Sequence, residues 1–104
     1  MTTDRLLAIL QHHVGKGHGI SVKQLAGMLN VPERKVRDFV SDARRSGHAV
    51  CGEPGTGYYL AANQEELEET CQFLQHRALT SLALVAALRR VPLSALMGQM
   101  KLEA

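Results

Sequence analysis

The chain has 104 residues, of which 45% are hydrophobic and 21% are charged, and its formal net charge is +2. This composition excludes a disordered chain, and the length allows one domain or one small domain with an appendage. No segment approaches the ~20 apolar residues that a bilayer span requires, and the first residues lack the features of a secretory signal peptide. We therefore expect a cytoplasmic protein without a membrane span, in which Cys51 and Cys71 are reduced thiols.

The charges are distributed unevenly along the chain. Residues 1–62 hold eight bases against five acids, a net of +3, whereas residues 63–104 hold four bases against five acids, a net of −1. A positive surplus suits contact with a polyanion such as nucleic acid. We therefore expect a domain over residues 1–62 that can face DNA and a helical segment over residues 63–104 with another task.

Two helices are predicted before residue 30. The first begins at Thr3, and its apolar stripe at helical spacing consists of Leu6, Leu7, Leu10 and Val14. Glycines then predict a loop, and Ile20 is expected to form a short strand or an anchor. Ser21 and Gln24 have the spacing of a capping box, which predicts a second helix through about Leu29. Its buried side is expected to consist of Leu25, Met28 and Leu29.

A tight turn and a third helix follow. Asn30 tolerates the left-handed conformation of such a turn, and Pro32 suits the first turn of the next helix. The third helix is predicted over about 33–46 and ends before Gly47. Its inward residues are expected to be Val36, Phe39, Val40 and Ala43. Its outward residues are expected to be Arg34, Arg37, Asp38, Ser41 and Arg45.

A β-hairpin is predicted next. Its strands, 48–51 and 58–60, flank residues 53–57, where Pro54, Gly55 and Gly57 are typical of a turn. Of Tyr58 and Tyr59, one ring is expected to pack on the domain while the other is solvent-exposed. The expected fold class is therefore mainly α with a small β-hairpin, in the element order of a winged helix-turn-helix, followed by a long C-terminal helix.

The segment from Gln24 to Leu60 carries a family signature. It contains QLAGMLNVPERKVRDFV, then Arg44 and Gly47, and then the hairpin ending PGTGYYL. It resembles the DNA-binding domain of biotin-operon-repressor-type winged helices, over a little more than half of the chain. The resemblance implies docking on double-stranded DNA. A ligase or another sensor domain follows in that family, but only 42 residues follow the hairpin here. We therefore expect no ligase activity.

The third helix is the expected reading element, because the major groove accommodates one α-helix. Arg34 and Arg37 are expected to read guanine, while lysines and further arginines hold phosphates. The complete set of expected DNA-contact residues is Ser21, Lys23, Pro32, Arg34, Lys35, Arg37, Ser41, Arg44, Arg45 and Thr56. The alternative is a solvated face on which Arg34 pairs with Asp38. The hairpin tip has Glu53 and no base, unlike many wings of the family, so its contact with DNA stays open.

A long helix is predicted from Asn63, its cap, to about Arg90, with Glu66 as the capping-box partner. After Pro92, residues 93–102 form a short helix or fray. Apolar residues surround most of 78–88, and a helix of about 27 residues is ~40 Å long, which exceeds what a small domain covers. We expect a homodimer through residues 63–90, with an interface of Leu67, Cys71, Leu74, Ala78, Leu82, Val85 and Leu88. The alternative is that residues 91–104 fold back over this helix. Cys71 is expected to be a small buried apolar residue rather than a redox switch.

No catalytic or metal-binding pattern is found. His12, His13 and His18 lack the spacing and third ligand of a metal site, and residues 52–57 lack the Lys-Ser/Thr of a P-loop. We therefore expect no enzyme, metal or cofactor. The predicted function is sequence-directed binding of double-stranded DNA by a small dimeric transcriptional regulator. The alternatives are a winged-helix protein-interaction module and a DNA-binding accessory factor of replication or packaging.

Overall fold

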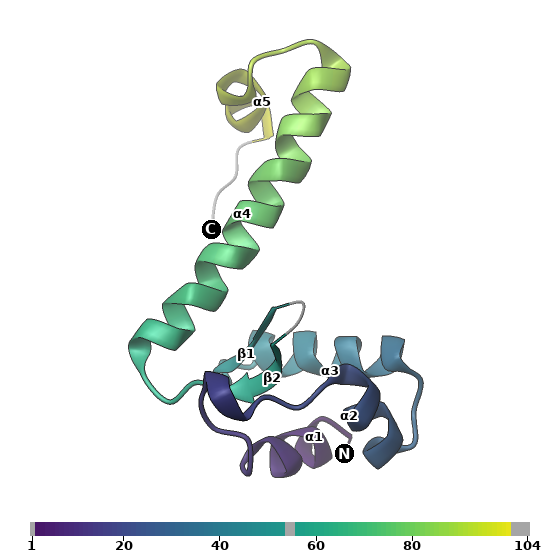
Figure 1. Ribbon diagram of the computed structural model, residues 1–104. Helices are drawn as coiled ribbons and strands as arrows, with labels where there is room; N and C mark the ends of the chain where they lie inside the picture. The colour runs from purple at the N-terminus through teal and green to yellow at the C-terminus, as the bar shows by residue number, and fades with distance from the viewer. Residues whose placement is uncertain (1, 54–55, 101–104) are drawn as a thin grey trace. The chain divides into compact units, whose positions relative to one another are not determined.

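The computed structural model describes residues 2–53 and 56–100 and has a mainly helical fold with a small antiparallel hairpin, as expected (Figure 1). Its elements are α1 (Thr2–Leu10), the short 3-10 helix η1 (Lys16–His18), α2 (Val22–Leu29), α3 (Glu33–Arg45), β1 (Val50–Glu53), β2 (Gly57–Leu60), α4 (Gln64–Arg89) and α5 (Leu93–Met100). The chain divides into two units after Thr70, inside α4. The first turns of α4 thus belong to the first unit, rather than following a boundary at residue 62.

Helices α1, α2 and α3 contact one another pairwise and enclose the core of the first unit. The helical residues of this core are Leu6, Leu10, Leu25, Leu29, Val36, Val40 and Ala43. Two residues differ from the prediction. Met28, which was expected on the buried side of the second helix, is 56% exposed, and Val14, on the apolar stripe predicted for the first helix, is 44% exposed. Val14 lies outside α1, because this helix ends at Leu10, and Val14 instead forms an isolated parallel bridge with Leu60 of β2.

Helix α2 begins and ends through the local interactions that its sequence predicts. The N–H of Gln24 donates to Ser21 Oγ at 3.1 Å, and the N–H of Ser21 donates back to Gln24 Oε1 at 3.4 Å, which completes the capping box. At the other end, Asn30 is left-handed with φ of 56°. The N–H of Val31 then reaches the carbonyl of Ala26 at 3.1 Å. This turn satisfies carbonyls at the end of α2 and leads directly into α3.

The hairpin starts two residues later than expected and is joined by Ile20. Ile20 and Tyr58 exchange two backbone hydrogen bonds, of 2.9 and 2.8 Å, so Ile20 forms the expected short strand contact. Gly57 permits this approach, because its φ is +73° and a Cβ there would lie 2.7 Å from the Ile20 carbonyl oxygen. Tyr59 is buried at 1% exposure, whereas Tyr58 is half-buried against the core rather than fully exposed.

The second unit contains the rest of α4 and the helix α5. Arg90 takes the left-handed conformation, with φ of 58°. The N–H of Val91 then donates to the carbonyl of Ala86 at 3.0 Å. This turn repeats the pattern of Asn30 and Val31, and Pro92 follows it as Pro32 follows the first. The axes of α4 and α5 differ by 102°. Ala86 and Leu96 are buried at 4% and 0% exposure, so α5 covers one side of the end of α4.

Candidate nucleic-acid interface

The outward face of α3 is the candidate interface. The buried stripe of this helix consists of Val36, Val40 and Ala43. At about 100° per residue, Arg34, Asp38 and Arg45 each lie roughly 120–180° around the helix from this stripe, so they point farthest outward. Arg37 lies nearer one flank. All four side chains are exposed, and the structure therefore brings three expected DNA-contact arginines onto one surface.

The charged side chains of this face differ in their partners. Arg45 Nη1 lies 3.1 Å from Asp42 Oδ1, and both groups are exposed. Arg34, Arg37 and Asp38 form no hydrogen bond or ion pair with any other residue that the structure describes. The alternative in which Arg34 is neutralised by Asp38 is thus absent here. The donors of Arg34 and Arg37 are available to a ligand.

The remaining expected contact residues surround this face. Ser21 is exposed at the N-terminus of α2, where its hydroxyl accepts a capping hydrogen bond, and Lys23 is exposed in the first turn. Pro32 is the exposed N-cap of α3. Lys35 is exposed on the flank of α3 opposite Arg37, and Ser41 is half-buried. The expected set is thus clustered at α3 and the start of α2, with two exceptions described next.

Arg44, an expected phosphate contact, is engaged within the protein. Its side chain is half-buried, and Nε donates to the carbonyl of Val50 at 2.8 Å. Its Nη2 atom is buried and has no hydrogen-bond partner among the described residues. A guanidinium held in this way connects the end of α3 to the start of β1. Because Arg44 lies about 100° or less around the helix from the buried stripe, it points along the protein surface and not outward.

Thr56 at the hairpin is also engaged within the protein. It is half-buried, and its hydroxyl donates to the Gly57 carbonyl at 3.4 Å. Its own carbonyl packs so closely against Gly19 that a Cβ at that position would clash with it. The side chain of Glu53 and residues 54–55 lie outside the described residues. The part of the hairpin tip that is described therefore offers no outward-pointing base.

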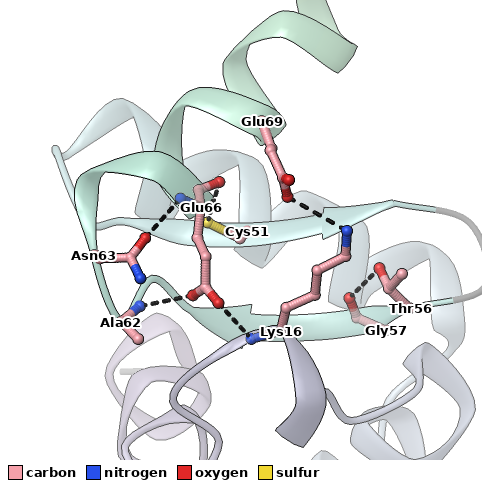
Figure 2. A network of polar contacts seen from close by, with 8 residues as sticks. All are labelled: Lys16, Cys51, Thr56, Gly57, Ala62, Asn63, Glu66 and Glu69. Carbon is pink, nitrogen blue, oxygen red and sulfur yellow. Dashed lines mark hydrogen bonds and ion pairs between the residues drawn. The ribbon is translucent and has the colours of Figure 1, made fainter.

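Within the first unit, a polar network attaches the start of α4 to η1 and to the end of the hairpin (Figure 2). The N–H of Glu66 donates to Asn63 Oδ1 at 2.9 Å, which confirms Asn63 as the cap. The carboxylate of Glu66 does not return to Asn63, as a capping box requires, but accepts from the N–H groups of Ala62 at 2.9 Å and Lys16 at 3.0 Å. Lys16 Nζ also pairs with Glu69 at 3.3 Å. Lys16 had no expected role.

This network lowers the pKa of the Glu66 carboxyl and lies beside a buried thiol. The backbone N–H groups of Ala62 and then Lys16 hold the pKa of the Glu66 carboxyl below its ordinary value, since they stabilise the charged form. Cys51 is buried, and its Sγ lies 3.7 Å from the Glu66 carbonyl oxygen. The first turn of α4 is therefore attached to η1 and β1, segments distant in sequence.

The expected oligomerisation residues fall into three environments. Leu67, in the first unit, is half-buried. In the second unit Leu82 and Val85 are also half-buried, on or near the side of α4 that α5 covers. The exposed members are Cys71, Leu74, Ala78 and Leu88. The expectation that Cys71 is buried is thus wrong. Leu84 is 62% exposed and was not among the expected interface residues.

In the last turns of α4, the leucines form a second side that α5 does not cover. Leu84 and Leu88 are each two residues from the buried Ala86, so they lie about 160° around the helix from it. Leu88 is 85% exposed. The last turns of α4 therefore have one side that α5 covers and an opposite apolar side, with Leu84 and Leu88, that is exposed.

Among the residues that the structure describes, no three His, Cys, Asp or Glu side chains are arranged to hold a metal ion. His13 Nδ1 instead lies 2.8 Å from the carbonyl oxygen of His18. Within the described ranges no single helix is long and apolar enough to cross a membrane, and α4 and α5 meet that test only together, across their 102° bend. Comparisons with protein-family models, with curated proteins and with solved structures find no match to this chain.

Proposed function

We propose that the first unit is a winged helix-turn-helix that binds double-stranded DNA in a sequence-directed way. Helices α2 and α3 form the helix-turn-helix, and the hairpin β1–β2 is the wing. Three features support this assignment: the element order, the tight turn at Asn30, and the pairing of Ile20 with β2. The resemblance of residues 24–60 to biotin-operon-repressor-type winged helices agrees with it.

The observation that carries the proposal is that Arg34 and Arg37 on α3 are exposed and have no hydrogen bond or ion pair with any residue in the described part of the chain. A major groove about 12 Å wide admits one helix, and arginine donates in pairs to O6 and N7 of guanine. Both residues lie in the first half of α3, the half that a helix-turn-helix places against base edges. Because neither side chain forms an ion pair with a described residue, base contact breaks no such pair. The free energy of binding therefore includes no cost for breaking one.

Phosphate contacts are assigned to the exposed bases around this face. Lys23 on α2 and Lys35 and Arg45 on α3 suit that role, whereas Arg44 does not because Val50 holds it. The described part of the wing contributes no base. Most of the electrostatic attraction to the duplex therefore comes from α2 and α3. Because the number of phosphates contacted sets the salt dependence of the affinity, we expect a shallow slope.

We further propose that the protein is a non-enzymatic transcriptional regulator acting as a homodimer. Leu84 and Leu88 form the interface, since they remain exposed on the side of α4 opposite Ala86. A two-fold interface uses the same patch of both subunits, so this one face is sufficient. Two copies then present their α3 helices to half-sites about 34 Å apart, one turn of the duplex.

Fluorescence anisotropy with a duplex selected from a random pool tests the DNA-binding role of α3. The double variant Arg34→Ala/Arg37→Ala should weaken binding by at least about tenfold, since each bidentate base contact contributes about 1–3 kcal/mol. The matched control Arg77→Ala/Arg89→Ala removes the same charge from α4 and should change the Kd much less. Equal losses from both double variants, or no binding by the wild type at low salt, would overturn the proposal.

A further inference from the structure

One acidic residue occupies the outermost line of α3. Asp38 lies about 140–160° around the helix from Val36, Val40 and Ala43, as far outward as Arg34 and Arg45. It is exposed, and within the described part of the chain it has no hydrogen bond or ion pair. The sequence places Arg34 four residues before it, the spacing of a helical ion pair, yet the two side chains do not pair.

The neighbouring acid behaves differently. Asp42, one turn further along α3, forms an ion pair with Arg45 at 3.1 Å. A free carboxylate on a surface that meets phosphates weakens binding to every sequence, because like charges repel. Among the residues that the structure describes, Asp38 is the one acid of α3 that both faces outward along this line and has no ion-pair partner. The charge of Asp38 therefore weakens binding to DNA unless a hydrogen bond between its carboxylate and a base offsets the repulsion.

We propose that Asp38 is a specificity-determining residue that accepts a hydrogen bond from the N4 amino group of cytosine in the major groove. This inference rests on the proposed DNA-binding function. Thymine and guanine present only acceptors on their major-groove polar edges, which a carboxylate repels. Adenine offers an amino group, but the acceptor N7 lies beside it. Cytosine is the base whose major-groove edge presents a donor with no acceptor on the same base, so a carboxylate can approach N4 from the side away from the guanine O6 of the pair.

The spacing along α3 extends this inference to a short site. Arg34 and Asp38 are separated by four residues, about 6 Å along the helix axis, which corresponds to one or two base-pair steps. Arg34 donates to guanine and Asp38 accepts from cytosine. The preferred half-site therefore contains a guanine and a cytosine one or two base pairs apart.

Selection of bound sequences from a random duplex pool tests this assignment with four proteins. The wild type should favour cytosine at one position by about tenfold, a value at the lower end of a direct base contact. Asp38→Ala should lose that preference, and Asp38→Asn should change it to adenine, because asparagine pairs with N6 and N7 of adenine. Asp42→Asn is the matched control: it removes the same charge one turn away and should keep the cytosine.

Affinity alone does not test the role of Asp38 in specificity. Asp38→Asn and Asp42→Asn each remove one negative charge from α3, so both should tighten binding to the unselected pool. A wild type that selects sites, together with Asp38 variants that select the same sites, overturns the role of Asp38 and leaves DNA binding by α3 intact. A wild type that enriches no sequence overturns the proposed function itself. Circular dichroism melting of each variant shows whether the exposed substitutions leave the fold unchanged.

Discussion

Replacing Leu88 by aspartate should dissociate the proposed dimer without unfolding the monomer. Leu88 is 85% exposed and Leu84 is 62% exposed, so a partner has most of both side chains left to cover. Full burial of a leucine contributes about 1.5–3 kcal/mol, which gives about 2–4 kcal/mol per copy and about 4–9 kcal/mol per two-fold dimer for this pair. Leu88→Asp removes more than half of that amount and places two carboxylates in the contact. The dimer Kd should rise by at least about 50-fold.

Sedimentation equilibrium of the full chain is the assay. The wild type should sediment near twice 11.4 kDa, and Leu88→Asp near 11.4 kDa at the same concentration. Gln72→Asp is the control, since it adds the same charge to an exposed position of α4 about 160° from Leu88. A wild type that is monomeric at tens of micromolar, or a Leu88→Asp variant as dimeric as Gln72→Asp, refutes the reasoning.

Three further changes test the first unit. Arg44→Ala should lower the free energy of unfolding by about 1.5–3 kcal/mol through loss of the bond to Val50, while the salt dependence of duplex binding stays as in the wild type; a flatter salt slope would restore Arg44 as a phosphate contact. Gly57→Ala should destabilise by about 2 kcal/mol or more in urea melts, because its φ is +73° and Ile20 leaves no room for a Cβ; wild-type stability would contradict the described strand contact. The pKa of Glu66 is lowered in the folded state, so its stabilisation is present above its ordinary value of 4.5 and is lost as the pH falls through the lowered pKa. Glu66→Gln should therefore melt below the wild type near pH 7, with a gap that narrows in acid; a gap that does not depend on pH would exclude this role of the carboxylate.

The elements that could be predicted from the sequence are those with short-range signals. Ser21 and Gln24 predict the start of α2 through two hydrogen bonds across three residues. Asn30 predicts the turn before α3, because asparagine tolerates the left-handed conformation that the turn requires. The outward arginines of α3 follow from helical periodicity and a strongly apolar opposite side. Each of these inferences depends on residues within one turn or one helix, so contacts with distant segments have little effect on it.

The features that could not be predicted depend on segments far apart in the chain. Glu66 bonds to the backbone of Lys16, fifty residues earlier, and no local pattern indicates that partner. Arg44 is a basic residue near the end of α3, which suggests a phosphate contact. In the fold, however, β1 lies beside α3, and Arg44 donates to the carbonyl of Val50. Cys71 lies on an apolar stripe and is nevertheless exposed, since periodicity identifies a side of a helix without saying what covers it.

The same limit applies to the long helix. Its sequence indicates an apolar surface that needs cover, and both the fold-back of the tail and a second copy satisfy that requirement. In the structure Ala86 faces the side that α5 covers, whereas Leu84 and Leu88 are exposed on the other side. Cover by the tail therefore accounts for one side of the helix, and cover of the other side by a second copy stays a prediction.

Sequencing of the duplexes that the wild-type chain retains from a random pool tests most directly whether it binds specific DNA sequences through α3 as a dimer. We expect enrichment of an inverted repeat whose half-sites are centred about 34 Å apart, one turn of the duplex, with G·C pairs in each half. Retention of the pool without enrichment of any sequence, or no retention at low salt, would contradict it.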